Sequence, residues 1–502
     1  MVAPIKKVRP RRPLKWIALG VYVALLLASH LTRAVRPDHP DTRGVKTIEV
    51  QAIQGEQRLN QTARLAYEEY RPNDAAPALV LLHGSPGRGR DFAALAPELG
   101  KEYRVIIPDL PGFGASSRDV PDYSIRAHAY YVLQLLNNLR IERAHVLGFS
   151  MGGGVALHMA DLAPERVISI TMLSAIGVQE MEMLGDYHLN HAIHGLQLAG
   201  LWLLSEGTPH FGWLDDAIFG VPYARNFYDS DQRPLRDILA RFNAPFSIIH
   251  GKDDVLVPVE AAREHYRLVP QSELTLFDEN HFMVFTDGPK LASLVRDFVN
   301  RVERGEAKTR ANADPERIAR AALPYNPADA PKAMGVTALV LMTLIILATL
   351  VSEDLTSIGV GVMVAQGRVG YLFGAFSCFL GIFVGDVLLY LAGRYLGRPA
   401  LKRGPLSWFI REDAVERSSR WFSRQGIAVI AASRFVPGMR LPTYFAAGML
   451  NTNFWWFCLY FFLAGAVWTP LLVGLSAKLG GEVIRSTLFA NQSLIVKALA
   501  AG

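Results

Sequence analysis

Residues 146–154 read VLGFSMGGG, an apolar run that leads into a serine with a glycine two positions away on each side. The run predicts a buried strand, and the residues after Ser150 predict a helix. A nucleophile on a sharp strand-to-helix turn needs small neighbours because the turn crowds them, and Gly148 and Gly152 meet that need. The pattern alone is weak, since it also arises by chance, so the surrounding sequence decides what Ser150 does.

Residues 45–302 alternate between strand and helix patterns. Short apolar runs predict strands at 77–84, 104–109, 144–149, 167–174, 246–251 and 273–278. Amphipathic patterns predict helices near 124–139, 151–163, 259–268 and 289–302. Such alternation is typical of a doubly wound, mainly parallel sheet with helices on both faces. A long insert at about 177–243 contains the apolar run HAIHGLQLAGLWLL, which predicts a helical cap.

The segment HGSPG, residues 83–87, follows an earlier predicted strand, where a loop that binds an oxyanion belongs. For a reaction at Ser150, we expect the backbone N–H groups of Ser85 and Met151 to stabilise the developing oxyanion. One such donor contributes a factor of about 10² to 10³ in rate in well-studied enzymes.

An acid and a histidine follow in the order Ser, Asp, His, which is one of the known orders of convergent triads. The segment GKDDVLVP places Asp253 and Asp254 after one strand, and NHF places His281 after the last. We expect Ser150 to attack, His281 to take and return the proton, and one of the two aspartates to orient His281. Asp109, in DLPGFGASS, is expected to hold its loop by hydrogen bonds.

Together, HGSPG, DLPGFGASS, GFSMGG, GKDDVLVP and ENHF resemble the α/β-hydrolase superfamily, more narrowly its esterase, haloperoxidase-like and carbon–carbon hydrolase branch. The resemblance covers 45–302 and implies an α/β-hydrolase fold with a serine esterase- or lipase-like activity. It implies Asp254 as the acid, because the acid of this family commonly stands four residues before a proline such as Pro258. Ser150 argues against the dehalogenase and epoxide-hydrolase branches, which carry aspartate there. An inactive copy of the fold is the alternative.

The composition indicates that part of the chain lies in lipid. Half of the 502 residues are hydrophobic, and the net charge of +6 gathers at the N-terminus and at 394–424. Basic clusters beside apolar spans are typical of membrane topology signals, so we expect no nucleic-acid partner. The apolar stretch 16–31 predicts an uncleaved anchor, with a cleaved signal peptide as the alternative. The basic side would face the cytoplasm, which places the hydrolase outside.

The remaining segments complete the domain organisation. Residues 1–44 form a basic start and anchor, 45–302 the hydrolase domain, 303–333 a charged linker and 334–502 a membrane domain. Apolar runs in the last part occur at 334–351, 357–365, 369–393, 427–449 and 453–477, several of them broken by Gly or Pro. Two cysteines, Cys378 and Cys458, suggest neither a disulfide framework nor a thiolate metal site.

Charged residues stand inside the apolar context of the membrane domain. Arg434 and Arg440 flank a proline–glycine break, and Asp386 and the pair Glu353–Asp354 are candidate partners. A charge at that depth is expensive, so it is paired or faces a wet cavity; the alternative is that these groups reach the interface.

The stretches GDVLLYLAGRYLGR (385–398) and SRFVPGMRLPTYFAAGML (433–450) resemble the DedA family, also called the SNARE-associated or VTT-domain family. The resemblance covers about 335–480 and implies a polytopic α-helical domain with two facing re-entrant helices. Several members are associated with moving lipids. It implies that Arg434, Arg440 and one acid of Glu353–Asp354 line a lipid path, with Asp386 as a candidate partner. Some members carry a further acid upstream, where this chain has VLMTLI, so proton coupling is in doubt.

The basic excess of the loop 394–424 places that loop in the cytoplasm. With the hydrolase outside, residues 334–367 must enter and return to the outer side. This constraint predicts a re-entrant hairpin there.

His188, His191 and His194 are spaced by three in the cap, so they could share one helix face as metal ligands. No carboxylate pattern accompanies them, so we expect no metal and no other cofactor, and we expect these residues at the cap surface or in a substrate pocket.

These observations predict an integral protein of a bacterial inner membrane whose hydrolase domain faces the periplasm. We expect a membrane-bound serine hydrolase that acts on an ester or lipid-like substrate, coupled to a module that handles membrane lipids. The alternatives are a DedA-type lipid transporter with an accessory α/β domain, a membrane acyltransferase, and two unrelated activities in one chain. The sequence gives no oligomeric state.

Overall fold

The computed structural model describes residues 13–35, 45–71, 73, 75–182, 185–215, 220–325, 335–365, 367, 369–402, 412–425, 429, 433 and 440–499. The chain divides into two compact units, Met1–Pro324 and Tyr325–Gly502, and each is described by itself.

The first unit is built on an eight-stranded sheet of order β1-β2-β4-β3-β5-β6-β7-β8. Its strands are β1 (Lys46–Gln54), β2 (Gln57–Tyr70), β3 (Ala78–Leu82), β4 (Arg104–Pro108), β5 (Ala144–Phe149), β6 (Val167–Leu173), β7 (Phe246–Gly251) and β8 (Glu273–Phe277). Strands β3 to β8 pair in parallel, and they are the six strands that the apolar runs predict. The doubly wound, mainly parallel sheet is therefore confirmed.

The antiparallel hairpin β1–β2 was not predicted. It turns at Gly55, whose φ of +59° favours glycine, and β2 joins the sheet antiparallel to β4. Much of β1 and the first half of β2 are exposed, so the hairpin lacks the continuous apolar run of the inner strands.

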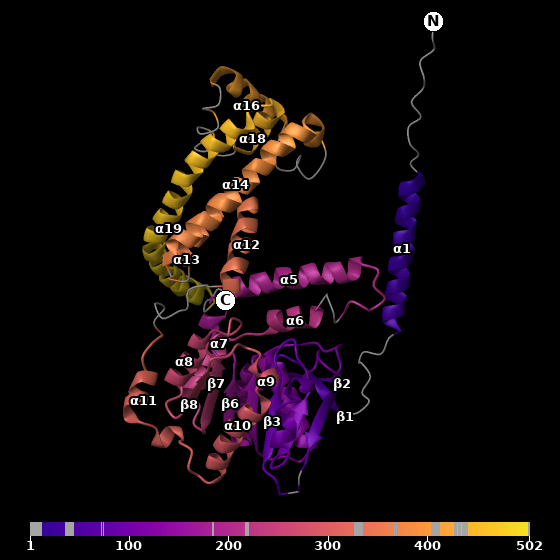
Figure 1. Cartoon of the computed structure of the whole chain (residues 1–502), viewed down its shortest axis with the longest axis vertical. Helices are drawn as coiled ribbons and strands as arrows, with labels where there is room; N and C mark the ends of the chain where they lie inside the picture. Colours follow the sequence, from indigo (N-terminus) through magenta and orange to yellow (C-terminus); the bar gives the residue numbers. More distant parts are fainter. Residues whose placement is uncertain are drawn as a thin grey trace. The chain divides into compact units, whose positions relative to one another are not determined.

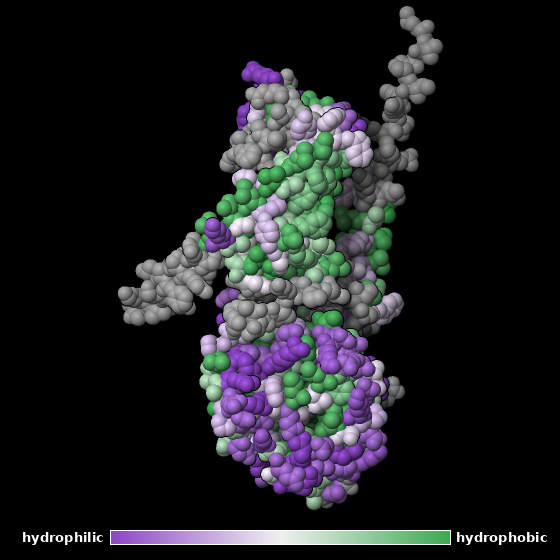
Figure 2. All heavy atoms as spheres, turned by 60° about the vertical axis from the view of Figure 1, so that its left-hand side comes forward, coloured by the Kyte–Doolittle hydropathy of each residue, from purple (hydrophilic) through white to green (hydrophobic). Residues whose placement is uncertain are grey.

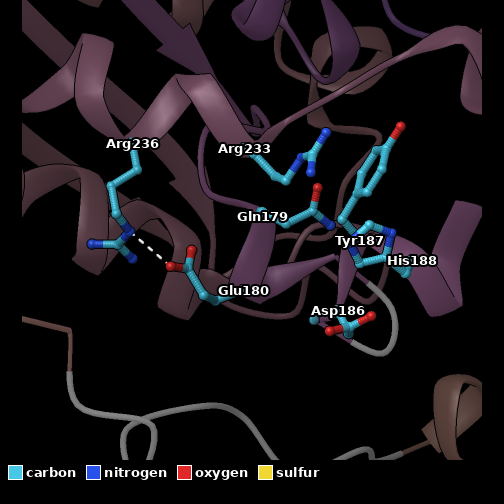
Figure 3. A pocket seen from close by; sticks show the side chains of 8 residues that line it. Gln179, Glu180, Asp186, Tyr187, His188, Arg233 and Arg236 are labelled. Carbon is cyan, nitrogen blue, oxygen red and sulfur yellow. Dashed lines mark hydrogen bonds and ion pairs between the residues drawn. The ribbon is translucent and has the colours of Figure 1, made fainter. Parts of the chain in front are cut away.

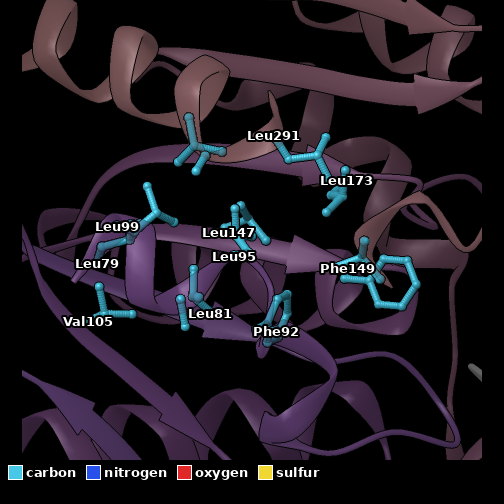
Figure 4. Packing of buried hydrophobic residues seen from close by; sticks show 14 of the residues in the cluster. Leu79, Leu81, Phe92, Leu95, Leu99, Val105, Leu147, Phe149, Leu173 and Leu291 are labelled. Atoms are coloured by element: carbon cyan, nitrogen blue, oxygen red, sulfur yellow. The ribbon is translucent and has the colours of Figure 1, made fainter. Parts of the chain in front are cut away.

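Helices cover both faces of the sheet (Figure 1). Alternate strand residues pack with α2 (Ala96–Leu99) and α10 (Gly288–Glu303) into one cluster, part of which Figure 4 shows; its strand members include Leu79, Leu81, Val105, Ile107, Leu147 and Phe149. The residues between them, among them Val80, Ile106, Val146 and Met172, are buried as well. That second face carries a layer in which α3 (Ile125–Asn138), α4 (Met151–Leu162), α7 (Arg233–Arg241) and α8 (Val259–Leu268) contact one another in turn.

The cap occupies the connection between β6 and β7, as predicted. It contains α5 (Tyr187–Gly207) and α6 (Val221–Asp229), which contact each other and lie beyond one end of the strands (Figure 1). The anchor helix α1 (Pro13–Ala34) contains a candidate membrane span, Trp16–Ala34.

The first unit extends beyond the predicted boundary at residue 302. Helix α11 (Pro315–Ala321), within the stretch expected to be a linker, packs against α8. Arg317 donates to the carbonyl of Ser272 at 2.7 Å, and its guanidinium lies 3.7 Å from the ring centre of Tyr266. Of the predicted linker, residues 326–333 lie outside the described residues.

The second unit is helical. Its longer helices are α12 (Gly335–Val351), α13 (Glu353–Ala365), α14 (Tyr371–Leu396), α16 (Glu412–Gln425), α18 (Arg440–Met449) and α19 (Phe454–Leu499). Two candidate spans, Tyr371–Leu396 and Phe454–Leu479, lie in this unit. Figure 2 shows hydrophobic residues over much of its visible face, whereas the visible face of the α/β unit is mainly hydrophilic.

Helices α14 and α18 approach backbone to backbone. A Cβ added at Gly393 would stand 2.1 Å from the carbonyl oxygen of Phe445, and one at Gly448 would stand 2.0 Å from that of Tyr390. Small residues permit this packing in membrane helices. Helices α12 and α13, of 17 and 13 residues, meet at Ser352, and the re-entrant hairpin in this region stays a prediction.

Candidate functional site

Ser150 occupies a strained turn between β5 and α4. Its φ of +54° and ψ of −120° are rare for a residue with a side chain, and its N–H donates to the carbonyl of Leu173 at 3.0 Å. A Cβ at Gly148 would stand 2.4 Å from the Gly152 carbonyl, and one at Gly152 would stand 2.2 Å from that of Leu82. The turn therefore requires both glycines, and strain at such a position is typical of functional sites.

The structure brings Asp254 and His281 together. The Nδ1 of His281 lies 2.7 Å from Oδ2 of Asp254, and both residues are buried. The other carboxylate oxygen, Oδ1, accepts from the N–H groups of Leu256 and Val257 at 2.9 and 2.8 Å. The carboxylate is thus held in place on one side and faces the imidazole with the other, whereas the side chain of Asp253 is exposed.

The loops that carry Asp254 and His281 are also joined through their backbones. The N–H of Asp253 donates to the carbonyl of Glu279 at 3.0 Å, and that of Lys252 donates to Phe277 at 2.7 Å. A Cβ at Gly251 would stand 2.3 Å from the Glu279 oxygen, so the close approach requires glycine. Sequence reasoning missed this role, although a glycine between the strand and the acid was a usable signal.

His281 also lies beside the turn that carries Ser150. Its ring centre is 5.1 Å from that of Phe149, the residue before Ser150. Phe282 and Phe285 continue this aromatic group and are 51% and 48% exposed, so the region has an apolar, accessible edge.

The HGSPG loop lies against the same turn. A Cβ at Gly84 would stand 2.9 Å from Cβ of Ser150, and Ser85 follows with a cis peptide bond to Pro86. Met151 begins α4 and is buried. Both candidate oxyanion donors, the N–H groups of Ser85 and Met151, thus belong to segments that adjoin Ser150.

His83 ties this loop to the following one. Its Nε2 accepts from the N–H of Leu110 at 2.9 Å, so its Nδ1, at 2.7 Å from the Gly84 carbonyl, is the donor. Burial lowers the pKa of His83, which agrees with the neutral ring that this arrangement requires.

Asp109 secures the neighbouring DLPG loop. Its carboxylate accepts from the N–H groups of Gly89 and Ala115 at 2.6 and 2.7 Å, and the Ser116 hydroxyl donates to its carbonyl at 2.5 Å. Both carboxylate oxygens are therefore engaged in fixing loops, as the sequence suggested.

A cavity of about 250 Å³ lies within the cap region, between the segment 179–188 and α7 (Figure 3). Charged side chains help to line it: Arg236 donates to Glu180 at 2.8 Å, and the Arg233 guanidinium lies 3.8 Å from the ring centre of Tyr187. The described residues that line it are Gln179, Glu180, Gly185, Asp186, Tyr187, His188, Arg233 and Arg236. Ser150, Asp254 and His281 are not among them.

The three cap histidines have different surroundings. His188 is exposed, His191 stacks on Tyr228 with ring centres 4.3 Å apart, and His194 Nε2 lies 3.2 Å from Glu182 Oε1. Within the described part of the chain, no group of three or more metal-ligating side chains is found.

In the second unit the structure brings three of the five predicted lipid-path residues together. Arg440 forms an ion pair with Glu353, and its Nε lies 3.7 Å from Oδ1 of Asp386, which is 2% exposed. Asp354 is exposed, and Arg434 lies outside the described residues.

Comparisons with known proteins divide the chain in the same way. Residues 77–196 match the family described as the alpha/beta hydrolase fold, and residues 351–478 match the VTT domain. An uncharacterized protein of Mycobacterium tuberculosis is 28% identical over 272 residues, which cover 47% of this chain and 79% of that protein. A 2-hydroxy-6-oxo-2,4-heptadienoate hydrolase of Pseudomonas putida is 27% identical over 251 residues, which cover 45% of this chain and 90% of that enzyme.

Solved structures with a similar arrangement include an esterase from Thermogutta terrifontis, with a TM-score of 0.41 and 19% identity over 51% of this chain and 99% of the esterase. A bacterial membrane phospholipase A has a TM-score of 0.40 and 22% identity, over 58% of this chain and 97% of the phospholipase. The family matches and the sheet order show an α/β-hydrolase fold and a VTT domain in one chain, and the VTT domain and three candidate membrane helices point to a membrane protein.

Proposed function

We propose that this protein is a membrane-bound serine hydrolase that cleaves an ester or lipid-like substrate through an acyl-enzyme, and that its VTT domain handles lipid in the same membrane. One observation carries the proposal most directly. His281 is fixed on Asp254 at 2.7 Å, beside the strained turn that presents Ser150.

The proposed reaction begins with attack of Ser150 Oγ on the substrate carbonyl carbon, while Nε2 of His281 takes the hydroxyl proton. The contact of Nδ1 with Asp254 selects the tautomer in which Nε2 is free to accept, and the carboxylate stabilises the imidazolium. The N–H groups of Ser85 and Met151 stabilise the oxyanion. His281 then returns the proton to the leaving group.

Water completes the proposed cycle. It attacks the acyl-enzyme carbonyl and gives a proton to His281, and this proton returns to Ser150 Oγ as the acid leaves. If another hydroxyl compound takes the place of water, the same residues perform acyl transfer. The exposed aromatic edge formed by Phe282 and Phe285 suits an apolar acyl chain and favours a lipid-like substrate.

Lipid handling by the VTT domain is proposed from the ion cluster of Arg440, Glu353 and Asp386. Charged groups within an apolar helical unit mark substrate paths in membrane proteins, and an arginine suits a phosphate headgroup. We place the protein in a bacterial inner membrane, with the basic N-terminus and the loop 394–424 in the cytoplasm and the hydrolase domain on the periplasmic side.

A serine-reactive fluorophosphonate tests the hydrolase proposal on the full chain in detergent. We expect labelling of the wild type, none with Ser150→Ala and strongly reduced labelling with His281→Ala. His188→Ala is the matched control, because His188 is exposed on the cap and should label as wild type. A wild-type protein that takes up no label and cleaves neither short-chain esters nor phospholipids contradicts the proposal.

Transfer of a fluorescent phospholipid across vesicles that contain the protein tests the second module. We expect Arg440→Ala to abolish transfer while fluorophosphonate labelling persists. If Ser150→Ala abolishes transfer too, the modules work as one machine; if it leaves transfer intact, lipid handling does not need the hydrolase.

A further inference from the structure

The cap helix α5 changes character halfway along its length. Its first half packs against α6: His191 stacks on Tyr228, and His194 lies 5.1 Å from Phe227 between ring centres. Most of its second half, residues 196–204, reads LQLAGLWLL and carries no charge. Large apolar side chains there are open to the surroundings: Leu196 is 76% exposed, Trp202 54%, Leu203 62% and Leu204 57%, and Trp213 just beyond is 76% exposed. A contiguous patch of this kind marks an interaction surface.

The far end of α5 is attached to the anchor helix α1. Tyr22, Ser29 and Arg33 are spaced by seven and four residues, which places them on one stripe of α1. Arg33 donates to Glu206 at 3.0 Å, and Ser29, 1% exposed, accepts from the N–H groups of His210 and Phe211 at 3.1 and 2.8 Å.

The last carbonyls of α5 also have protein partners. A helix leaves its final carbonyls without intrahelical donors, and water usually satisfies them. Here Tyr22 donates to Gly207, His30 Nε2 lies 3.0 Å from the Glu206 oxygen, and His210 Nε2 lies 3.1 Å from that of Ser205. Internal satisfaction of backbone carbonyls is what a segment within lipid requires.

The depth of the attachment follows from helix geometry. The side chains of Tyr22, His30 and Arg33 all reach the last residues of α5, and Ser29 reaches the segment just after it. All four residues lie inside the candidate span Trp16–Ala34. Ser29 is five positions before the end of that span, or about 7.5 Å at 1.5 Å per residue. If α1 crosses a bilayer, these contacts hold the C-terminal end of α5 at the membrane.

We propose that the cap segment Leu196–Leu204, together with Trp213, inserts into the lipid bilayer beside α1. The segment is uncharged, apolar and contains tryptophan, as expected of a helix at a membrane interface. The insertion rests on α1 as a membrane span and not on catalysis. If the proposed function holds, the inserted cap lies in the membrane that contains the substrate. A lipid-like substrate can then enter the hydrolase domain without leaving the membrane.

Fluorescence at one position tests the insertion. The full chain with Cys378→Ala and Cys458→Ala receives a single cysteine, Leu203→Cys, carries the dye NBD and is placed in nanodiscs that each hold one copy. Lys101→Cys is the matched control, because Lys101 lies on the α/β unit with its side chain 63% exposed. We expect nitroxide-bearing lipid to quench the dye at 203 and not at 101, and aqueous iodide to quench it at 101 and only weakly at 203.

Each other outcome overturns the proposal. Iodide quenching at 203 equal to that at 101 means that the segment lies in water. A dye at 203 that neither quencher reaches means that protein covers the segment. If the dye at 203 is protected from iodide only in nanodiscs that hold two copies, a second copy of the chain covers the segment.

A second measurement connects insertion with substrate access. The variant with Trp202→Ser, Leu203→Ser and Leu204→Ser is compared with wild type on a soluble short-chain ester and on a long-chain ester embedded in vesicles. We expect the ratio of vesicle to soluble turnover to fall; an unchanged ratio contradicts access through the inserted cap. If wild type cleaves neither ester, the proposed function fails, while the quenching result still decides the insertion.

Discussion

Asp254 presents one carboxylate oxygen to His281 and anchors the other on two backbone N–H groups, at 2.9 and 2.8 Å. The neighbouring Asp253 is exposed, and its backbone N–H ties the loop to Glu279. The two adjacent acids therefore have separable roles, one through its side chain and one through its backbone.

Asp254→Asn is expected to reduce ester turnover by a factor of about 10⁴, because an amide stabilises the wrong tautomer of the histidine. Asp253→Asn keeps the backbone bond and should stay near wild type. Turnover of a chromogenic ester by the two variants in detergent measures the difference. Equal losses, or a larger loss with Asp253→Asn, would show that the acid has been misassigned.

Gly251→Ala is expected to destabilise the α/β unit by about 1–3 kcal/mol, the usual cost of overpacking, because the new methyl group would meet the Glu279 carbonyl at 2.3 Å. Ester turnover should fall as well, since the shift separates the loops of Asp254 and His281. Gly200→Ala is the control: it lies in α5 with nothing within 4 Å of its Cβ position. Thermal unfolding in detergent gives the comparison, and equal melting temperatures would argue against a required contact.

The inner sheet was predictable because β3 to β7 are almost wholly buried, and each therefore reads as a short apolar run. The edge strand β8 is only partly buried, but its alternating apolar residues gave a similar signal. The hairpin β1–β2 and the packing of helix α11 were not predictable in this way, since both elements are largely exposed and their polar residues interrupt the pattern. The structure of these elements depends on contacts with segments that are distant in the sequence. Arg317 of α11, for example, lies over the ring of Tyr266 and donates to the carbonyl of Ser272.

In the candidate site, too, local sequence patterns predicted some features and not others. Ser150, Asp254 and His281 follow strand ends, so local patterns placed them near one edge of the sheet. The contact of Gly251 with Glu279, and that of Tyr22 with Gly207 across 185 positions, depend on how distant segments meet. A single sequence carries little information about such pairs.

Buried histidines make the α/β unit sensitive to acid. Burial lowers the pKa of His265 to about 3, so between pH 6.5 and 3 the unfolded chain binds a proton that the folded chain does not. Stability should therefore fall as the pH falls through this window, by up to about 1.4 kcal/mol per pH unit for each such group. His128, with a pKa lowered to about 3, and His158, lowered to about 4, act in the same direction.

His265→Gln removes one of the groups that bind a proton in the unfolded chain but not in the folded chain. We expect the drop in melting temperature from pH 7.5 to pH 5 to be smaller in this variant than in wild type. The exposed His188, changed to Gln, should leave the drop unchanged. A wild-type drop that His265→Gln fails to reduce would mean that other groups cause the acid sensitivity.

The helical unit is expected to lose more stability when Arg440 alone is replaced than when Arg440, Glu353 and Asp386 are all replaced by uncharged residues. Arg440→Met leaves the carboxylates of Glu353 and Asp386 without the cation beside them, and breaking a buried pair in this way costs about 3–5 kcal/mol. The triple variant Arg440→Met, Glu353→Gln and Asp386→Asn removes the charges of these three side chains and should recover most of that loss. Asp354→Asn, at an exposed neighbour, is the control and should be neutral.

Thermal stability in detergent and lipid transfer in vesicles separate the structural and functional roles of this cluster. If the triple variant is stable yet transfers no lipid, the charges serve lipid handling rather than folding. If it is stable and transfers lipid at the wild-type rate, the cluster is dispensable and the lipid path lies elsewhere. A single variant as stable as wild type would instead show that groups other than Arg440 balance the two carboxylates.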